Sequence, residues 1–173
     1  MHLWYSVLQM MLGSDIMRNY WLMKSEPDVY SWSMLVKDKS THWDGVRNYQ
    51  ARNIMRDSMK MGDLVLFYHS NCKPPHIAGI ARICKESYPD FTSWDPKSKY
   101  FDPKSSEEDP RWFMVDIEPI TDINTVNLQD AKANQDLMGL PLIRKGQRLS
   151  VQPVSSEHFE IICQMGGIIN IPI

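Results

Sequence analysis

Cysteines, long apolar runs and excess positive charge are all scarce in this sequence of 173 residues. No run of about 18 apolar residues occurs, so no membrane-spanning helix and no membrane partner are expected. Its cysteines are odd in number and widely spaced (Cys72, Cys84 and Cys163), which indicates no disulfide framework and favours reduced thiols. We therefore predict an intracellular protein, cytoplasmic if its source is bacterial and nuclear if it is eukaryotic.

Net charge limits the possible partners. The formal net charge is −2, with 19 basic and 21 acidic residues. A non-specific coat for duplex DNA would be far more basic. Any contact with nucleic acid must therefore be local and involve few phosphates.

Residue patterns typical of catalysis or metal binding are also scarce. No glycine-rich phosphate loop is present. His69, Cys72 and His76 lie close together but lack a fourth ligand for zinc. Cys72 and His69 could instead act as nucleophile and base, yet no orienting acid or oxyanion device is evident. We predict no metal, no cofactor and no catalytic residue.

What the sequence does contain is the composition of an ordinary globular domain, 43% apolar and 23% charged. The globular pattern begins at residue 20, so residues 1–19 are interpreted as an extension and residues 20–173 as one domain. Residues 1–17 are compatible with an upstream translation start, an interfacial or packing helix, or a targeting peptide. Met17 would be a plausible alternative start.

Hydrophobic periodicity predicts a mixed α/β domain. Most predicted strands lack the long intervening helices of a doubly wound sheet, so a small, strongly bent sheet or barrel of about five to six strands with flanking helices fits best. A polar segment over residues 88–110 is predicted to be a functional or mobile loop, with Trp94 and Tyr100 as its two aromatic residues of interest. The predicted strands cover residues 20–24, 64–68, 77–84, 112–118 and 148–152, and the predicted helices begin after Ser31, span 49–59 and 126–138, and begin at Ser155 or Ser156.

The most informative stretch spans residues 42–53. It brings together two aromatic side chains, two arginines and two amides: Trp43, Tyr49, Arg47, Arg52, Asn48 and Asn53. Aromatic rings stack on a nucleobase, guanidinium groups hold phosphates, and amides read a polar base edge. A second polar cluster, residues 68–71, follows a buried strand. Together they predict a recognition pocket.

Each feature also has a structural interpretation. Aromatic residues in a small barrel are often core, and Arg52 and Arg56 could form a solvated helix face. Serine and asparagine in loops most often make turns and caps. No single motif therefore decides between a pocket and a scaffold.

Three segments together resemble the EVE domain, the family of the thymocyte nuclear proteins and their bacterial relatives. They are YWLMKSEP at 20–27, WDGVRNYQARN at 43–53 and FYHSNC at 67–72. The resemblance implies a PUA-like curved barrel, kinship with YTH domains and recognition of modified bases. By similarity of position, Trp43 and Trp94 are the implied walls of an aromatic cage. Ser25 and Asn71 are the implied polar groups, with Asn48 and Tyr49 nearby.

We therefore predict a binding module, not an enzyme, whose partner is DNA or RNA with a modified base. That base would be a methylated or hydroxymethylated cytosine or a methylated adenine. Two alternatives stay open: an enzyme acting on a nucleotide or RNA, and a small-molecule or protein-interaction domain, each using the same pocket. The predicted ligand-binding residues are Ser25, Trp43, Asn48, Tyr49, Tyr68, Ser70, Asn71 and Trp94, and the predicted phosphate-binding residues are Lys24, Arg47 and Arg52.

Overall fold

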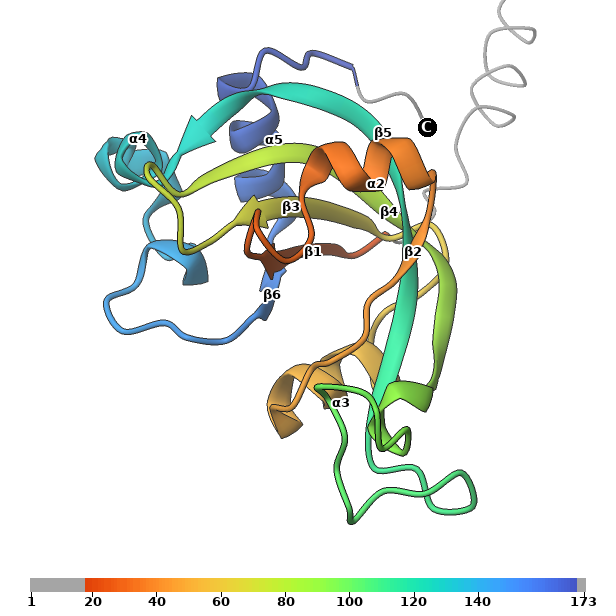
Figure 1. The fold of residues 1–173 in the computed structure, drawn as a ribbon. Coiled ribbons are helices and arrows are strands. Elements are labelled where there is room, and N and C mark those ends of the chain that lie inside the picture. The colour runs from red at the N-terminus through yellow and green to blue at the C-terminus, as the bar shows by residue number, and fades with distance from the viewer. Residues whose placement is uncertain (1–17, 171–173) are drawn as a thin grey trace, which may run out of the picture.

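A computed structural model describes residues 18–170. Its centre is a six-stranded mixed sheet with strand order β2-β5-β4-β3-β1-β6 (Figure 1). The expected mixed α/β class and strongly bent sheet are confirmed. The strands are β1 (Tyr20–Ser25), β2 (Thr41–His42), β3 (Leu64–His69), β4 (His76–Pro89), β5 (Phe113–Asn127) and β6 (Val151–Val154), and the helices are α2 (Trp32–Asp38), α3 (Tyr49–Asp57), α4 (Leu128–Ala133) and α5 (Ser156–Met165).

Strands β4 and β5 form a long bent ribbon. They are 14 and 15 residues long, and their pairing shifts register at four points. Each shift is a bulge or irregularity that increases local bending. The sequence predicted only the first half of each strand, because the second half is largely exposed or half-buried and leaves no apolar pattern.

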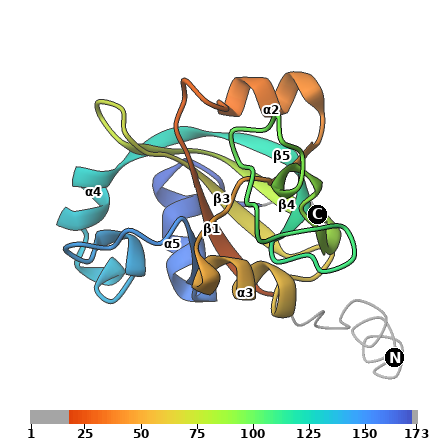
Figure 2. The ribbon, with the colours of Figure 1, turned by 60° about the horizontal axis from the view of Figure 1, so that its bottom comes forward.

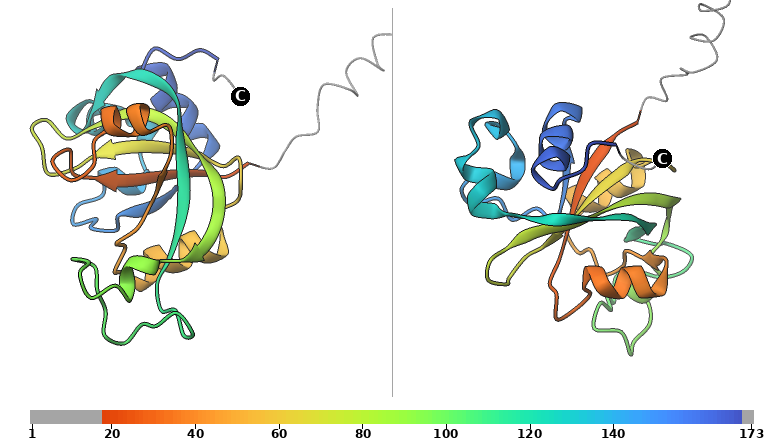
Figure 3. Two further views of the ribbon diagram at one scale, coloured as in Figure 1. Left: turned by 45° about the vertical axis from the view of Figure 1, so that its right-hand side comes forward. Right: turned by 90° about the horizontal axis from the view of Figure 1, so that it is seen from above.

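The two faces of the sheet bury separate cores (Figure 3). We call the side covered by α2 and α3 the pocket face; its core surrounds Phe67 and Trp43. We call the side covered by α4 and α5 the opposite face; its core surrounds Leu66 and Phe159. Strand β3 contributes to both, because successive side chains of a strand point to opposite sides.

Two predicted elements differ from the structure. The helix expected over residues 126–138 is the short α4 followed by a 3₁₀ turn, Gln135–Leu137. The strand expected to end before Pro153 instead contains it. Strand β6 is at the edge of the sheet, where one side needs no ladder donor and proline is tolerated.

The predicted helix caps are confirmed. The side chain of Ser31 accepts a hydrogen bond from the Met34 amide, and that of Ser155 accepts one from the His158 amide. Such caps satisfy orphan amides in the first turn of a helix. Within residues 18–170, every helix is too short or too polar to cross a bilayer. The interpretations of residues 1–17 lie outside the described part of the chain.

Candidate functional site

A pocket of about 580 Å³ lies on the pocket face. Four segments that are distant in sequence line it: the end of β1 with the loop after it, the stretch from β2 towards α3, the long loop after β4, and Ser150 just before β6. Figure 2 shows the paths of these segments in the ribbon. The lining residues are Lys24, Ser25, Glu26, Val29, Tyr30, Thr41, His42, Trp43, Asp44, Gly45, Val46, Arg47, Lys99, Tyr100 and Ser150.

Trp43 joins the pocket to the core. It is 8% exposed, and its ring meets the Phe67 ring edge-on at 5.6 Å between centroids. Its amide donates to the Val115 carbonyl, which ties the residue to β5 just after β2 ends. The indole is therefore held rigidly by the core while part of it remains on the pocket wall.

The polar tip of Trp43 differs from those of three other tryptophans. Indole N–H groups of Trp21, Trp32 and Trp112 donate to the carboxylates of Asp63, Asp122 and Asp102, respectively. Among the described residues the Trp43 N–H has no acceptor, and this atom is not among the fully enclosed polar atoms that lack a partner. A ligand in the pocket could accept from it.

Tyr100 is one of three large aromatic residues in the lining, with Trp43 and Tyr30. Its ring lies so close to Gly45 that a Cβ there would fall 2.5 Å from the ring, and Gly45 has φ +74°. Glycine is required here for both conformation and space. The Asp-Gly turn after Trp43 therefore determines where Tyr100 can sit.

Arg47 connects the loop that carries Tyr100 to the buried Asp90. Its Nη1 forms an ion pair with Asp90 at 2.8 Å, and its Nε donates to the Tyr100 carbonyl at 2.9 Å. Burial alone would raise the pKa of the Asp90 carboxyl, but hydrogen bonds from Thr92, Arg47 and the Gly45 amide outweigh it and lower that pKa. The predicted phosphate ligand Arg47 thus has a partner inside the protein.

The pocket lining includes Asp44, whose carboxylate has its own backbone amide as a hydrogen-bond donor. Burial, followed by the charge of Asp90, raises its pKa. Among the described residues, no hydrogen bond joins the Asp44 carboxylate to another side chain. Ser25 is more committed, since its hydroxyl donates to the Tyr30 carbonyl at 2.7 Å.

Lys24 lines the pocket, but its ammonium group lies elsewhere. Nζ donates to the Gln147 carbonyl at 3.3 Å and lies 6.0 Å from the centroid of the Tyr68 ring. Burial lowers the pKa of the amine. Of the predicted site residues, the pocket lining contains Lys24, Ser25, Trp43 and Arg47.

Three predicted residues of the α3 region form a neighbouring surface. The Asn48 side chain caps α3 by accepting from the Ala51 amide. The Tyr49 ring stacks on Trp112 with centroids 4.9 Å apart, and the Arg52 guanidinium lies 4.8 Å from the Tyr49 centroid. These side chains lie outside the pocket lining.

The predicted cluster after β3 also lies outside the lining. Tyr68 is 4% exposed in the core of the opposite face, and burial raises its pKa to about 12. The Ser70 amide donates to the Ser25 carbonyl, and the Asn71 amide group donates to Glu26. Ser70 and Asn71 therefore brace the loop behind Ser25.

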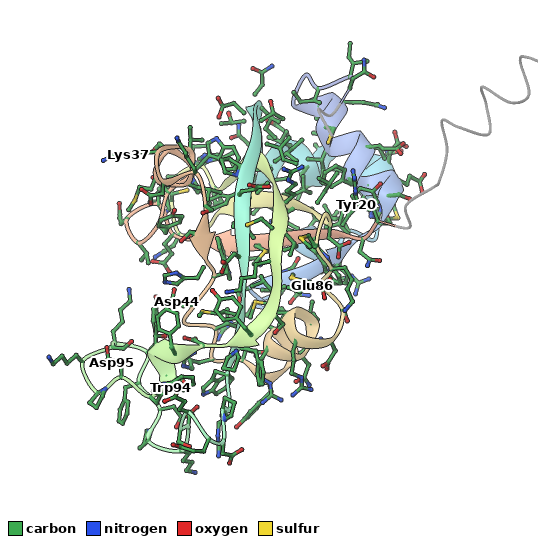
Figure 4. The ribbon with its side chains drawn as sticks, turned by 90° about the vertical axis from the view of Figure 1, so that its right-hand side faces the viewer. Tyr20, Lys37, Asp44, Glu86, Trp94 and Asp95 are labelled. Carbon is green, nitrogen blue, oxygen red and sulfur yellow. The ribbon has the colours of Figure 1, made fainter. Side chains whose placement is uncertain are left out.

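Trp94 is the predicted cage wall that the structure places apart from the pocket. It is half-buried on the loop after β4 and is not part of the lining. Figure 4 shows it next to Asp95 on that loop, with Asp44 between this loop and α2. Tyr100, six residues further along the same loop, lines the pocket instead. The sequence pointed to both aromatic residues of that loop, and the close packing of Tyr100 on Gly45 is what distinguishes the two in the structure.

His69 has a structural partner. Its Nε2 accepts from the Trp32 amide at 3.0 Å, and its ring lies 5.0 Å from that of His76. Within residues 18–170, no group of three or more His, Cys, Asp or Glu side chains is arranged to hold a metal ion.

Comparison with known proteins places this geometry in a family. Residues 19–165 match the EVE domain family. Mouse thymocyte nuclear protein 1 is 39% identical over 173 aligned residues, which cover 88% of this chain and 76% of that protein. Among solved structures, a Pseudomonas syringae protein is 49% identical with a TM-score of 0.80, covering 84% of this chain and 98% of its own. The human THYN1 protein, solved in complex with DNA that contains 5-methylcytosine, is 38% identical with a TM-score of 0.80, covering 89% of this chain and 99% of that chain.

Proposed function

Since this chain belongs to the EVE domain family, we propose that it is a reader of modified DNA whose pocket holds a single 5-methylcytosine base. The observation that carries the proposal is the rigid pocket between Trp43 and Tyr100. The complex of the human THYN1 protein with 5-methylcytosine DNA supports the choice of ligand.

The dimensions of the pocket suit one base. A volume of about 580 Å³ lies within the range of small-molecule sites, roughly 300–1,000 Å³. Stacking of one base on an aromatic side chain contributes about 1–3 kcal/mol. Extruding a base from a duplex costs a few kcal/mol, so stacking must be supplemented by contacts to the backbone.

A methyl group would be recognised by the apolar part of the lining. Val29 and Val46 line the pocket together with the aromatic residues Tyr30, Trp43 and Tyr100. Burying one methyl group stabilises a complex by about 0.8 kcal/mol, which corresponds to roughly fourfold in affinity. A modest preference for 5-methylcytosine over cytosine is therefore expected from this term.

Backbone contacts are proposed on both sides of the pocket. Lys99 lines the mouth, with Nζ 4.8 Å from the Tyr100 centroid. Arg52 and Arg111 lie on the neighbouring surface, where Arg111 donates to the Tyr49 hydroxyl. These cations would hold phosphates beside the extruded nucleotide. Arg47 would act indirectly, by positioning Tyr100.

The test is fluorescence anisotropy with matched duplexes that contain 5-methylcytosine or cytosine, and with RNA of the same sequence. Wild type should bind the methylated DNA most tightly. Tyr100→Ala should weaken that binding about 5- to 150-fold, the equivalent of one stacked base. Phe101→Ala is the matched control, because Phe101 is 43% exposed beside Tyr100 and is not in the lining.

Equal affinity of wild type for methylated and unmethylated DNA would overturn the proposal, and tighter binding to the RNA would replace DNA as the ligand. A salt titration separates the proposal from a small-molecule site. Contacts to two or three phosphates should give a slope of log affinity against log salt of about −2 to −3.

A further inference from the structure

Asp44 lines the pocket, and its carboxylate makes no hydrogen bond to another side chain of the described residues. The neighbouring acid, Asp90, accepts from the Gly45 amide at 3.0 Å, from the Thr92 amide at 2.9 Å and from Arg47 at 2.8 Å. Among the described residues, the Asp44 carboxylate has its own backbone amide as a donor but no hydrogen bond to another side chain. Two acids that lie close in space therefore have different roles, one structural and one facing the ligand space.

The chemistry of a carboxylate restricts what can occupy the space beside it. An ionised carboxylate only accepts hydrogen bonds, so it needs a donor from the ligand. An acceptor placed opposite it would leave two sets of lone pairs facing each other in a partly desolvated site. A half-buried charge without a partner is costly, which makes the penalty for a wrong ligand larger than the gain from a right one.

We infer that Asp44 is a specificity-determining residue of the pocket, which accepts a hydrogen bond from the exocyclic amine of cytosine and rejects thymine and uracil. This inference rests on the proposed function. Carboxylates accept from cytosine N4, whereas thymine and uracil present a carbonyl oxygen at the same position. Thymine is therefore the critical competitor, because it carries the same 5-methyl group as 5-methylcytosine and differs at the amine.

The adjacent residue supplies the complementary group. Trp43 lines the same pocket, and its indole N–H has no acceptor among the described residues. A cytosine ring carries both a donor, N4, and acceptors, N3 and O2. Residues 43 and 44 thus contribute one donor and one acceptor to the same lining, the two kinds of group that the mixed polar edge of an aminopyrimidine needs.

The experiment separates the amine from the methyl group. Cytosine, 5-methylcytosine, uracil and thymine are each placed opposite an abasic site in the same duplex, so that no pairing partner biases extrusion. Anisotropy gives four affinities for wild type. Two affinity ratios, cytosine over uracil and 5-methylcytosine over thymine, measure the contribution of the amine to binding; we call them the amine ratios. Two others, 5-methylcytosine over cytosine and thymine over uracil, measure the contribution of the methyl group; we call them the methyl ratios.

For wild type we expect both amine ratios to be about tenfold or more. Asp44→Asn offers both a donor and an acceptor at the same position, so both amine ratios should fall to near one while the methyl ratios persist. Glu26→Gln is the matched control: it also removes one negative charge from the lining, and it should shift all four affinities together without changing the amine ratios.

Thermal melting verifies that each variant is folded, which is expected for Asp44→Asn because the asparagine oxygen can still accept from the amide of the same residue. Amine ratios near one in wild type, or ratios that Asp44→Asn leaves unchanged, would overturn the inference. Methyl ratios of one would instead overturn the proposed function and leave the amine ratios interpretable. The two failures are therefore distinguishable.

Discussion

The two faces of the sheet are built from different chemistry. The core of the pocket face contains Trp21, Trp32 and Trp43, whereas the opposite face is filled mainly by leucine and isoleucine around Phe159. Tryptophan combines a large apolar area with a polar N–H that needs a partner. On the pocket face, acids satisfy the N–H groups of Trp21 and Trp32 and leave the one at the pocket available to a ligand.

This difference indicates that one face mainly stabilises the fold and the other forms the pocket. The opposite face stabilises the fold by burying apolar area and carries no part of the site. The pocket face uses amphipathic rings, glycines and acids, each of which positions another group. Substitutions on the opposite face should therefore change stability without changing base preference, and substitutions on the pocket face should change both.

The largest effect is expected from Phe159→Ala on the opposite face. Phe159 is fully buried, and its ring lies 4.6 Å from that of Tyr20. The cavity should reduce the free energy of unfolding by about 3–5 kcal/mol, as measured by urea denaturation. The ratio of affinities for 5-methylcytosine and cytosine should stay the same. Ile169→Ala, at a 93% exposed position, is the control; a changed ratio in Phe159→Ala would refute the division between the faces.

Arg47→Ala tests the pocket face through its ion pair. The Arg47 side chain is 23% exposed and that of Asp90 is fully buried, so removal of the guanidinium leaves a buried carboxylate with fewer partners. We expect a loss of about 2 kcal/mol in unfolding free energy, together with weaker DNA binding because Tyr100 is released. Arg56→Ala removes an exposed pair with Asp57 and should leave unfolding unchanged. Loss of stability with unchanged DNA affinity would show that Arg47 does not position the pocket.

Gly45→Ala sharpens the comparison within the pocket face. Gly45 has φ +74°, and Gly62 has φ +89° with open space on the side where a Cβ would lie, so Gly62→Ala measures backbone strain alone. Each should cost about 1–2 kcal/mol from the left-handed conformation. Gly45→Ala should in addition displace the Tyr100 ring and weaken DNA binding. Equal DNA affinities of the two variants would contradict the role assigned to Tyr100.

The alternation of side chains between the two faces of a strand explains which site residues could be predicted from the sequence. The 64–68 strand was predicted from its continuous apolar character, but a strand buried on both sides has no alternation from which a facing can be read. The structure places Val65 and Phe67 on the pocket face and Tyr68 on the opposite one. The sequence therefore predicted Tyr68 as a ligand-binding residue, whereas its ring lies in the core of the opposite face.

Long-range contacts account for the other differences. Asn48 and Asn71 belong to motifs that resemble the family, but their local roles, a helix cap and a loop brace, follow from ordinary preferences of asparagine. Trp94 and Tyr100 lie in one polar segment without periodicity, so only the packing of Tyr100 on Gly45 distinguishes them. Trp43 combines the two roles that the sequence left open, because it lies in the pocket lining and is also only 8% exposed, packed against Phe67 in the core.

The smallest expected effect is a pH dependence on the pocket face. Burial, followed by the charge of His76, lowers the pKa of His69, whose neutral ring accepts from the Trp32 amide at the start of α2. Because the unfolded chain then binds the proton more readily, stability should be constant above the unfolded value of about 6.5 and should fall as pH decreases from there to the folded-state pKa. Melting temperatures measured from pH 8 to pH 5 would show this.

His69→Gln is the variant that isolates the effect. Glutamine retains an acceptor for the Trp32 amide but does not titrate, so this part of the pH dependence should disappear while the fold is retained. Phe159→Ala should keep the full pH dependence at its lower stability, since the opposite face contributes nothing to it. If Phe159→Ala removed the pH dependence and His69→Gln preserved it, the acid sensitivity would belong to the opposite face, and the pocket face would not be the part of the sheet that responds to solution conditions.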